Sequence, residues 1–79
     1  METAYVLITC DLGSEAEIID ELKQFTNVKE AHGVFGAYDI LAKVESDSVE
    51  SLKDTITWKI RKLKRVSSTL TLMLTKGQE

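Results

Sequence analysis

The residues best suited to bind a small molecule lie around a turn between two strand-like runs. Gly33 and Gly36 give this turn backbone freedom, and Asp39 follows three residues after the second glycine. Backbone N–H groups exposed by such a turn can hold a carboxylate, while the Asp39 carboxylate can accept hydrogen bonds from an ammonium group. The turn therefore predicts a site for a small zwitterion such as a free amino acid.

Simpler roles for the same residues stay open. Both glycines fit a hairpin that needs a positive φ, and Asp39 fits a turn acid that bonds to its own backbone. Thr69 and Thr71 carry short hydroxyls that can orient a ligand, yet threonine is also an ordinary residue of a half-buried strand.

Residue types that commonly carry catalysis are sparse. His32 is the only histidine and Cys10 the only cysteine, so neither a Ser-His-Asp set nor a Cys-His pair has support in the sequence. A solitary histidine fits a strand end or an interface better than a metal site, and Cys10 fits a small packed side chain. We therefore expect no enzyme activity, no metal and no cofactor.

The composition is that of one small domain that needs a partner. The 79 residues carry a net charge of -3, and 43% of them are hydrophobic. This is enough for a single domain over 1–79, but a chain of this size can bury only a small hydrophobic core of its own. No disulfide can form within the chain, and we see neither a signal sequence nor a membrane-spanning run, so we expect a cytoplasmic protein without membrane contact. The acidic balance argues against direct DNA binding.

Hydrophobic periodicity predicts four strands and two helices. The Ser14-Glu15-Ala16-Glu17 run has the pattern of a capping box, and Asp47 can cap a second helix, since Glu50 follows three residues later. The apolar residues of that second helix fall along one stripe: Val49, Leu52, Ile56, Ile60 and Leu63. The expected strands cover 4–11, 28–35, 38–44 and 66–75.

This order predicts an α+β fold of the ferredoxin-like type, βαββαβ, with a four-stranded antiparallel sheet and two helices on one face. The other face of the sheet stays uncovered, although apolar side chains are expected near it: Tyr5, Leu7, Leu41 and Met73. Such a face is normally covered by another subunit, so we expect a partner subunit against it.

Trp58 lies almost opposite the apolar stripe of the second helix, which favours a role as an interface anchor. A surface aromatic or packing on the last strand is the alternative. Its neighbours form the one basic cluster: Lys59, Arg61, Lys62, Lys64 and Arg65. A solvated helix end explains this cluster best, with nucleic acid or acidic residues of another subunit as the other options.

Two runs carry a resemblance to a known family. The run Gly36-Ala37-Tyr38-Asp39-Ile40-Leu41-Ala42-Lys43-Val44 and the later run Val66-Ser67-Ser68-Thr69-Leu70-Thr71 resemble the effector-binding domain of the Lrp/AsnC transcriptional regulators. The resemblance covers nearly the whole chain, and the Gly-x-Tyr-Asp turn is its most specific part. Family members usually carry an N-terminal helix-turn-helix domain, so this chain resembles a stand-alone form of the sensing and assembly module.

The resemblance implies dimers that pair through their sheets. It further implies that four such dimers assemble into a ring, an octamer, with free amino acids bound where dimers meet. It places the ligand between a turn and the last strand of a neighbouring dimer, with the start of the second helix nearby. The residues implied by position are Phe35, Gly36, Ala37, Tyr38 and Asp39 in the turn, Ser68, Thr69 and Thr71 in the strand, and Val49 at the helix start. Co-assembly with full-length regulators of the same family is a further implication.

The sequence therefore predicts a non-catalytic module that binds amino acids and oligomerises, with Tyr5, Leu7, Trp58 and Met73 at interfaces. Two alternatives stay open. A small enzyme of the dimeric ferredoxin-like barrel type would enclose a pocket within each subunit, lined by residues such as His32 and Tyr5. An assembly adaptor would bind no ligand at all.

Overall fold

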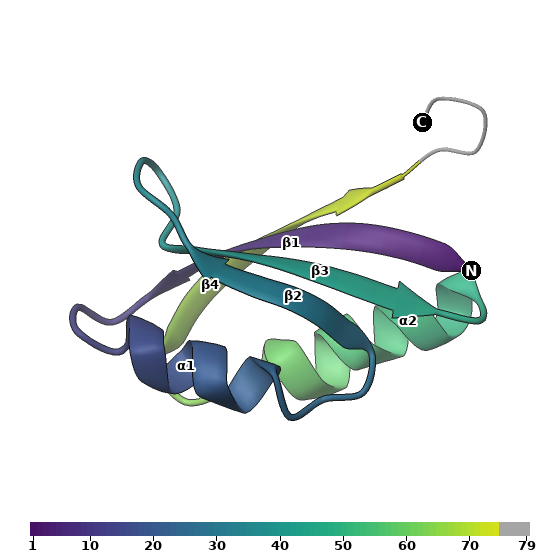
Figure 1. Cartoon of the computed structure of the whole chain (residues 1–79), viewed down its shortest axis with the longest axis horizontal. Helices are drawn as coiled ribbons and strands as arrows, with labels where there is room; N and C mark the ends of the chain where they lie inside the picture. Colours follow the sequence, from purple (N-terminus) through teal and green to yellow (C-terminus); the bar gives the residue numbers. More distant parts are fainter. Residues whose placement is uncertain (75–79) are drawn as a thin grey trace.

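The computed structural model describes residues 1–74, which form four strands and two helices (Figure 1). The chain runs through β1 (Glu2–Cys10), α1 (Glu15–Leu22), β2 (Val28–Gly33), β3 (Ile40–Ser46), α2 (Val49–Thr55), the π-helical segment η1 (Ile56–Ile60) and β4 (Val66–Met73). Thr75, the last residue of the expected fourth strand, lies outside the described residues. No helix within 1–74 is both long enough and apolar enough to cross a membrane.

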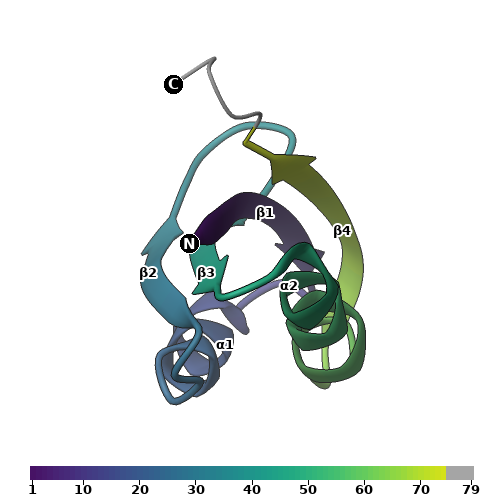
Figure 2. The same ribbon diagram turned by 90° about the vertical axis from the view of Figure 1, so that its right-hand side faces the viewer.

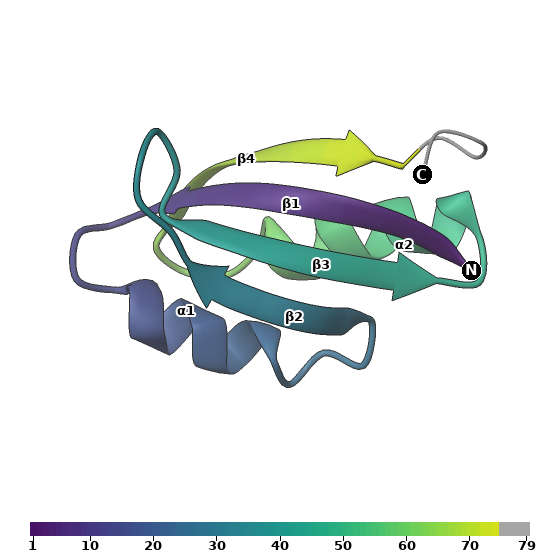
Figure 3. The same cartoon turned by 45° about the horizontal axis from the view of Figure 1, so that its top comes forward.

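The strands form one antiparallel sheet in the order β2-β3-β1-β4, with both helices on the same face (Figures 1 and 3). This is the ferredoxin-like βαββαβ arrangement that the sequence predicts. The central strands β1 and β3 pair from Glu2–Ser46 to Ile8–Ile40, while β4 pairs with β1 and leaves its other edge free. The register between β1 and β4 shifts at Thr9 and Cys10.

The core lies between the sheet and the helices, and strand alternation explains why. Ala4, Val6 and Ile8 are every second residue of β1, and each has no exposed surface. The buried residues of the other elements complete this layer: Ile18, Leu22, Val28, Ala31, Ile40, Ala42, Val44, Leu52, Ile56 and Ile60. One side of the sheet thus holds the whole buried cluster.

The opposite side of the sheet, which we call the outer face, is open. Pairing places Tyr5 opposite Leu72 and Leu7 opposite both Leu41 and Leu70, so these five side chains share that face. Leu70 and Leu72 are 43% and 50% exposed. Figure 2 shows the sheet end-on with both helices below it and no helix on this side.

Met73 is not on the outer face, and this sequence prediction was wrong. Met73 pairs with Ala4, whose side chain is fully buried toward the helices, so Met73 points to the helix side of the sheet. Both sets of alternating side chains in β4 are partly apolar, so the sequence pattern does not show which set faces the helices. Leu70 and Leu72 take the place on the outer face that was expected for Met73.

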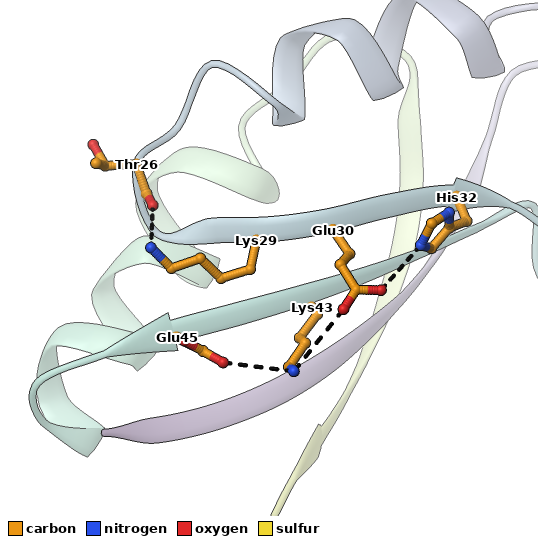
Figure 4. A network of polar contacts seen from close by, with 6 residues as sticks. All are labelled: Thr26, Lys29, Glu30, His32, Lys43 and Glu45. Atoms are coloured by element: carbon orange, nitrogen blue, oxygen red, sulfur yellow. Dashed lines mark hydrogen bonds and ion pairs between the residues drawn. The ribbon is translucent and has the colours of Figure 1, made fainter.

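The β2–β3 half of the outer face is charged. Lys43 Nζ lies 3.9 Å from Glu30 Oε2 and 3.6 Å from Glu45 Oε2, and His32 Nε2 lies 3.1 Å from Glu30 Oε1 (Figure 4). These side chains are well exposed or half-exposed, so each contact contributes at most about 1 kcal/mol. The outer face is thus apolar over β1 and β4 and polar over β2.

Helix α1 does not begin with the expected capping box. The Ser14 hydroxyl donates to the Asp11 carbonyl oxygen at 2.6 Å and makes no cap hydrogen bond to the helix. Ser14 is nearly buried in the tight turn after β1, where its N–H also donates to Asp11 O at 3.1 Å. The turn therefore uses the hydroxyl that the capping box would need.

Helix α2 is capped one residue later than expected. The Ser48 Oγ accepts a hydrogen bond from the Ser51 N–H at 3.1 Å, and Ser48 has the extended backbone of an N-cap. Asp47 is therefore not the cap. Because Ser48 is the cap in place of Asp47, the helix begins at Val49. The buried stripe of the helix does not change.

The second helix widens into a π-turn over Ile56–Ile60. The Arg61 N–H donates to the Ile56 carbonyl at 3.0 Å, a bond across five residues. In an α-helix, side chains four positions apart drift around the axis in one direction, and a turn with an extra residue shifts them back in the other. Leu52, Ile56 and Ile60 accordingly all face the core.

Candidate functional site

The first half of the candidate site is the loop between β2 and β3. It leaves the sheet after Gly33 pairs with Ile40, and Gly36 adopts a φ of 130° that L-residues avoid. The loop is closed by a hydrogen bond from Val34 N–H to Asp39 O at 2.9 Å. Figures 1 and 2 show the loop rising from the sheet on the side away from the helices, and Phe35 in it is fully exposed.

Asp39 joins this loop to β1 through two hydrogen bonds. Its N–H donates to Ile8 O at 2.9 Å, and its Oδ2 accepts from Cys10 N–H at 2.9 Å. Cys10 lies beyond the last residue pair of β1 and β3, so no backbone carbonyl of β3 accepts its N–H. The Asp39 carboxylate takes the place of that carbonyl. The role of a turn acid that bonds to backbone is therefore real, although the backbone belongs to β1.

Polar groups of the loop are left over after this anchoring. Within residues 1–74, Asp39 Oδ1 accepts no hydrogen bond from an N–H group, and the N–H groups of Gly36, Ala37 and Tyr38 make no backbone hydrogen bond. Tyr38 and Asp39 are half-buried, while 34–37 are exposed. The turn thus offers both a negative acceptor and several donors to a ligand.

The thiol of Cys10, beside Asp39, has a raised pKa. Burial raises the pKa of its thiol above the ordinary value, and the negative charges of Asp39 and Glu15 act in the same direction, against a hydrogen bond from Ser14 that lowers it. The thiol therefore stays protonated at neutral pH, as expected for a packed side chain.

The second half of the candidate site is a groove between β4 and the second helix. Its volume is about 420 Å³, within the range of small-molecule sites. Two cations, three hydroxyls and two apolar side chains line it: Lys53, Arg61, Thr57, Thr69, Thr71, Ile56 and Met73. The groove can therefore hold a small molecule that has both a polar and an apolar part.

The three predicted strand residues do not share one face. Thr69 pairs with Ile8 and Thr71 with Val6, so both point to the helix side and into the groove. Ser68 pairs with Thr9, and the two hydroxyl oxygens lie 2.6 Å apart on the outer face. A smaller hollow of about 240 Å³ at the edge of β4 nevertheless touches Ser68, Thr69 and Arg61.

The predicted turn and strand residues are not brought together within one subunit. Neither hollow is lined by a residue of 34–39. Val49 is the first residue of α2 and is 41% exposed, one helical turn before Lys53, so it continues the groove's row but does not line it. His32 and Tyr5, the residues of the enzyme alternative, line neither hollow.

Sequence reasoning missed the helical side of the groove. Lys53, Thr57 and Arg61 lie four residues apart beside the buried row of Leu52 and Ile56. This polar row next to the core was the available signal. The sequence pattern alone instead favours a solvated helix end for Arg61.

No group of three or more metal-binding side chains comes together within 1–74. The absence of a metal or cofactor in the protein stays a prediction.

Comparison with known proteins gives the family. Residues 3–77 match the model of the Lrp/AsnC ligand binding domain. An uncharacterised HTH-type transcriptional regulator of Pyrococcus furiosus is 34% identical over 74 residues, which are 90% of this chain and 49% of that protein. The chain therefore spans about half the length of the curated relatives it matches.

Solved structures agree with this fold. The crystal structure of FFRP-DM1 is 39% identical with a TM-score of 0.91, and the match covers 95% of this chain and 100% of that one. A transcriptional regulator from Neisseria meningitidis, solved in complex with L-Met, shares only the fold: 10% identity, a TM-score of 0.83, and coverage of 99% of this chain and 52% of that one. With a family model that spans nearly its whole length, this chain belongs to the Lrp/AsnC ligand binding domain family.

Proposed function

We propose that this chain is a non-catalytic, cytoplasmic module that binds a free amino acid where copies of it meet. One observation carries the proposal. The turn and the groove have complementary chemistry, yet in a single subunit they do not line a common hollow. A complete site then needs the turn of one copy and the groove of another.

The turn suits the head group of an amino acid. The free N–H groups of Gly36 and Ala37 can donate to its carboxylate, and Asp39 Oδ1 can accept from its ammonium group. Pairing both charges is necessary, because a buried polar group without a partner costs roughly 2–7 kcal/mol. We therefore propose that Phe35–Asp39 recognise the head group.

The groove suits the rest of the ligand. Thr69 and Thr71 can orient it through their hydroxyls, while Ile56 and Met73 offer an apolar surface for its side chain. The regulator of the same fold from Neisseria meningitidis binds L-Met, which supports an amino acid as the ligand class here. Regulators related in sequence carry an HTH part, so we further propose co-assembly with such regulators.

The outer face supports the pairing of copies. Five apolar side chains lie there without cover, two of them more than two-fifths exposed: Tyr5, Leu7, Leu41, Leu70 and Leu72. We propose that two copies pair through this face and that such dimers assemble further, as in a ring of four. The ligand sites lie between dimers.

Calorimetric titration with each of the twenty amino acids tests the sensor proposal. We expect at least one to bind with a saturable signal, and binding of none would remove the proposal in favour of an assembly adaptor. An enclosed site within one subunit would instead favour the enzyme alternative.

Mixing of variants tests whether the site spans copies. Asp39→Asn removes a charge from the turn and Thr71→Val removes a hydroxyl from the groove. Each variant alone should therefore bind the amino acid about tenfold or more weakly. An equimolar mixed assembly contains some contacts with an intact turn from one copy and an intact groove from the other. Recovery of part of the binding supports a shared site, and no recovery places both residues in one subunit's own pocket.

A further inference from the structure

The exposed side of the second helix carries four side chains spaced four residues apart. Glu50 and Asp54 lie in α2, Trp58 lies in η1, and Lys62 follows η1. All four are exposed, Trp58 by 65%. Residues four apart are neighbours on a helix surface, and the Lys62 Nζ lies 5.4 Å from the centre of the Trp58 ring. We call this row the α2 stripe.

The α2 stripe has unused binding capacity. Among residues 1–74, the carboxylates of Glu50 and Asp54 form no ion pair and no side-chain hydrogen bond. At the other end of the stripe lies a hollow of about 300 Å³ lined by Thr57, Trp58, Arg61 and Lys62. A large exposed aromatic next to a hollow and free charges is typical of an interface anchor.

The charges along the stripe are ordered so that a second stripe running in the opposite direction meets them with opposite charge. The stripe reads acid, acid, aromatic, base, and positions 50 and 62 are symmetric about 56, as are 54 and 58. A second stripe that runs antiparallel therefore places Glu50 against Lys62. It also places Asp54 against Trp58, whose indole N–H can donate to a carboxylate.

We propose that the α2 stripe binds the same stripe of a second copy across a two-fold axis at the level of Ile56. With a rise of about 1.5 Å per residue, the two Trp58 side chains then lie about 6 Å apart along the helix direction. That spacing allows contact of two aromatic rings. The contact is isologous, because each copy contributes the same four residues.

A second copy fits this stripe better than other partners. Nucleic acid and acidic peptides meet Glu50 and Asp54 on the same row as Lys62, and these carboxylates repel them. A wholly basic partner is repelled by Lys62 in the same way. Only a partner with the reversed charge order satisfies both ends, and the chain itself has that order.

The stripe contact is separate from the proposed pairing through the outer face. The second helix lies on the opposite side of the sheet from that face (Figure 2), so one copy can make both contacts at once. Two such contacts per chain extend the assembly beyond two copies. The inference does not depend on which ligand the protein binds.

Charge reversal tests the proposal on the full chain. Lys62→Glu places two acids against each other at both ends of the contact, and Glu50→Lys places two bases there. We expect each to raise the dissociation constant of assemblies larger than a dimer by about tenfold or more, measured by analytical ultracentrifugation at low salt. The double variant Glu50→Lys with Lys62→Glu should restore the assembly, and so should an equimolar mixture of the two single variants.

Trp58 gives an independent readout because it is the only tryptophan. Its emission should shift to shorter wavelength as the concentration rises and the larger species form, and this shift should disappear in Lys62→Glu. At a concentration too low for the larger species to form, circular dichroism should give similar melting temperatures for all variants, since the exchanged side chains are exposed. Single reversals that leave the mass distribution unchanged, a double variant that does not recover, or Trp58 emission that ignores assembly would each overturn the proposal.

Discussion

Asp39 has one oxygen committed to the fold and one that accepts no backbone N–H among residues 1–74. Its Oδ2 accepts from Cys10 N–H, which fastens the β2–β3 loop to the end of β1. Its Oδ1 forms no ion pair with a cation of the described residues, although the Cys10 thiol interacts with the same carboxylate. The structural and ligand-binding roles that the sequence left as alternatives are therefore compatible with each other.

Two substitutions separate the roles of Asp39. Asparagine keeps a carbonyl oxygen for Cys10 N–H but loses the negative charge, so Asp39→Asn should keep stability within about 0.5 kcal/mol while amino-acid affinity falls by about tenfold or more. Alanine loses the acceptor as well, so Asp39→Ala should also lower the free energy of unfolding by about 1–2 kcal/mol. Urea unfolding measures the free energy of unfolding, and calorimetry measures the affinity for the amino acid. Equal effects of both variants on stability would show that the charge itself holds the loop.

Single residues show how far a sequence can locate this site. The binding chemistry of the turn could be predicted, because its glycines and its acid lie close together in the sequence, although the same residues also suit a plain turn. The partner of Asp39 was not, since Cys10 lies twenty-nine residues away and meets it only after the strands pair. Arg61 was missed for the same reason: its position on the groove depends on the packing of the helix beside β4.

At the scale of elements, the two helix starts differ from their sequence patterns for local reasons. Ser14 fits a capping box but lies in a tight turn that uses its hydroxyl as a donor. Asp47 and Ser48 both fit a cap, and only Ser48 has its oxygen placed to accept from Ser51 N–H. Composition identifies a helix start to within a residue, while the preceding turn decides which side chain caps it.

The cap assignment predicts an asymmetry between neighbours. Ser48→Ala should lower the free energy of unfolding by about 0.5–2 kcal/mol, because the Ser51 N–H loses its acceptor. Asp47→Ala should change it by less than about 0.5 kcal/mol, since the exposed carboxylate only interacts with the helix dipole at a distance. Thermal unfolding of the two variants gives the comparison. A larger loss for Asp47→Ala would restore Asp47 as the cap.

Strand β4 shows why element order is easier to predict than element orientation. Its location and approximate extent follow from a run of β-formers, and the sheet order follows from the βαββαβ topology. Its two faces, however, are nearly equal in hydrophobicity, and the more apolar one, with Leu70 and Leu72, faces away from the helices. The pairing with β1, rather than composition, decides this.

At the scale of the whole molecule, the difference between the two sides of β4 predicts different effects on assembly. Leu72→Lys puts a charge on the outer face of both copies and should weaken the dimer by about a hundredfold. Met73→Lys, one residue along, puts the same charge in the groove and should leave the dimer intact while it weakens amino-acid binding. Light scattering over a dilution series measures the dimer, and loss of the dimer in Met73→Lys alone would place the contact on the helix side.

The wide turn in the second helix has a consequence for how this chain can vary. Because a π-turn takes up one residue more than an α-turn, removing one residue from 56–60 would leave an ordinary α-turn and keep the side chains that follow, Arg61 and Lys62 among them, in place. A deletion elsewhere in α2, where the helix has no extra residue, would instead rotate everything that follows by about 100°. The chain can therefore lose one residue in this segment and still keep both its core and its surface rows.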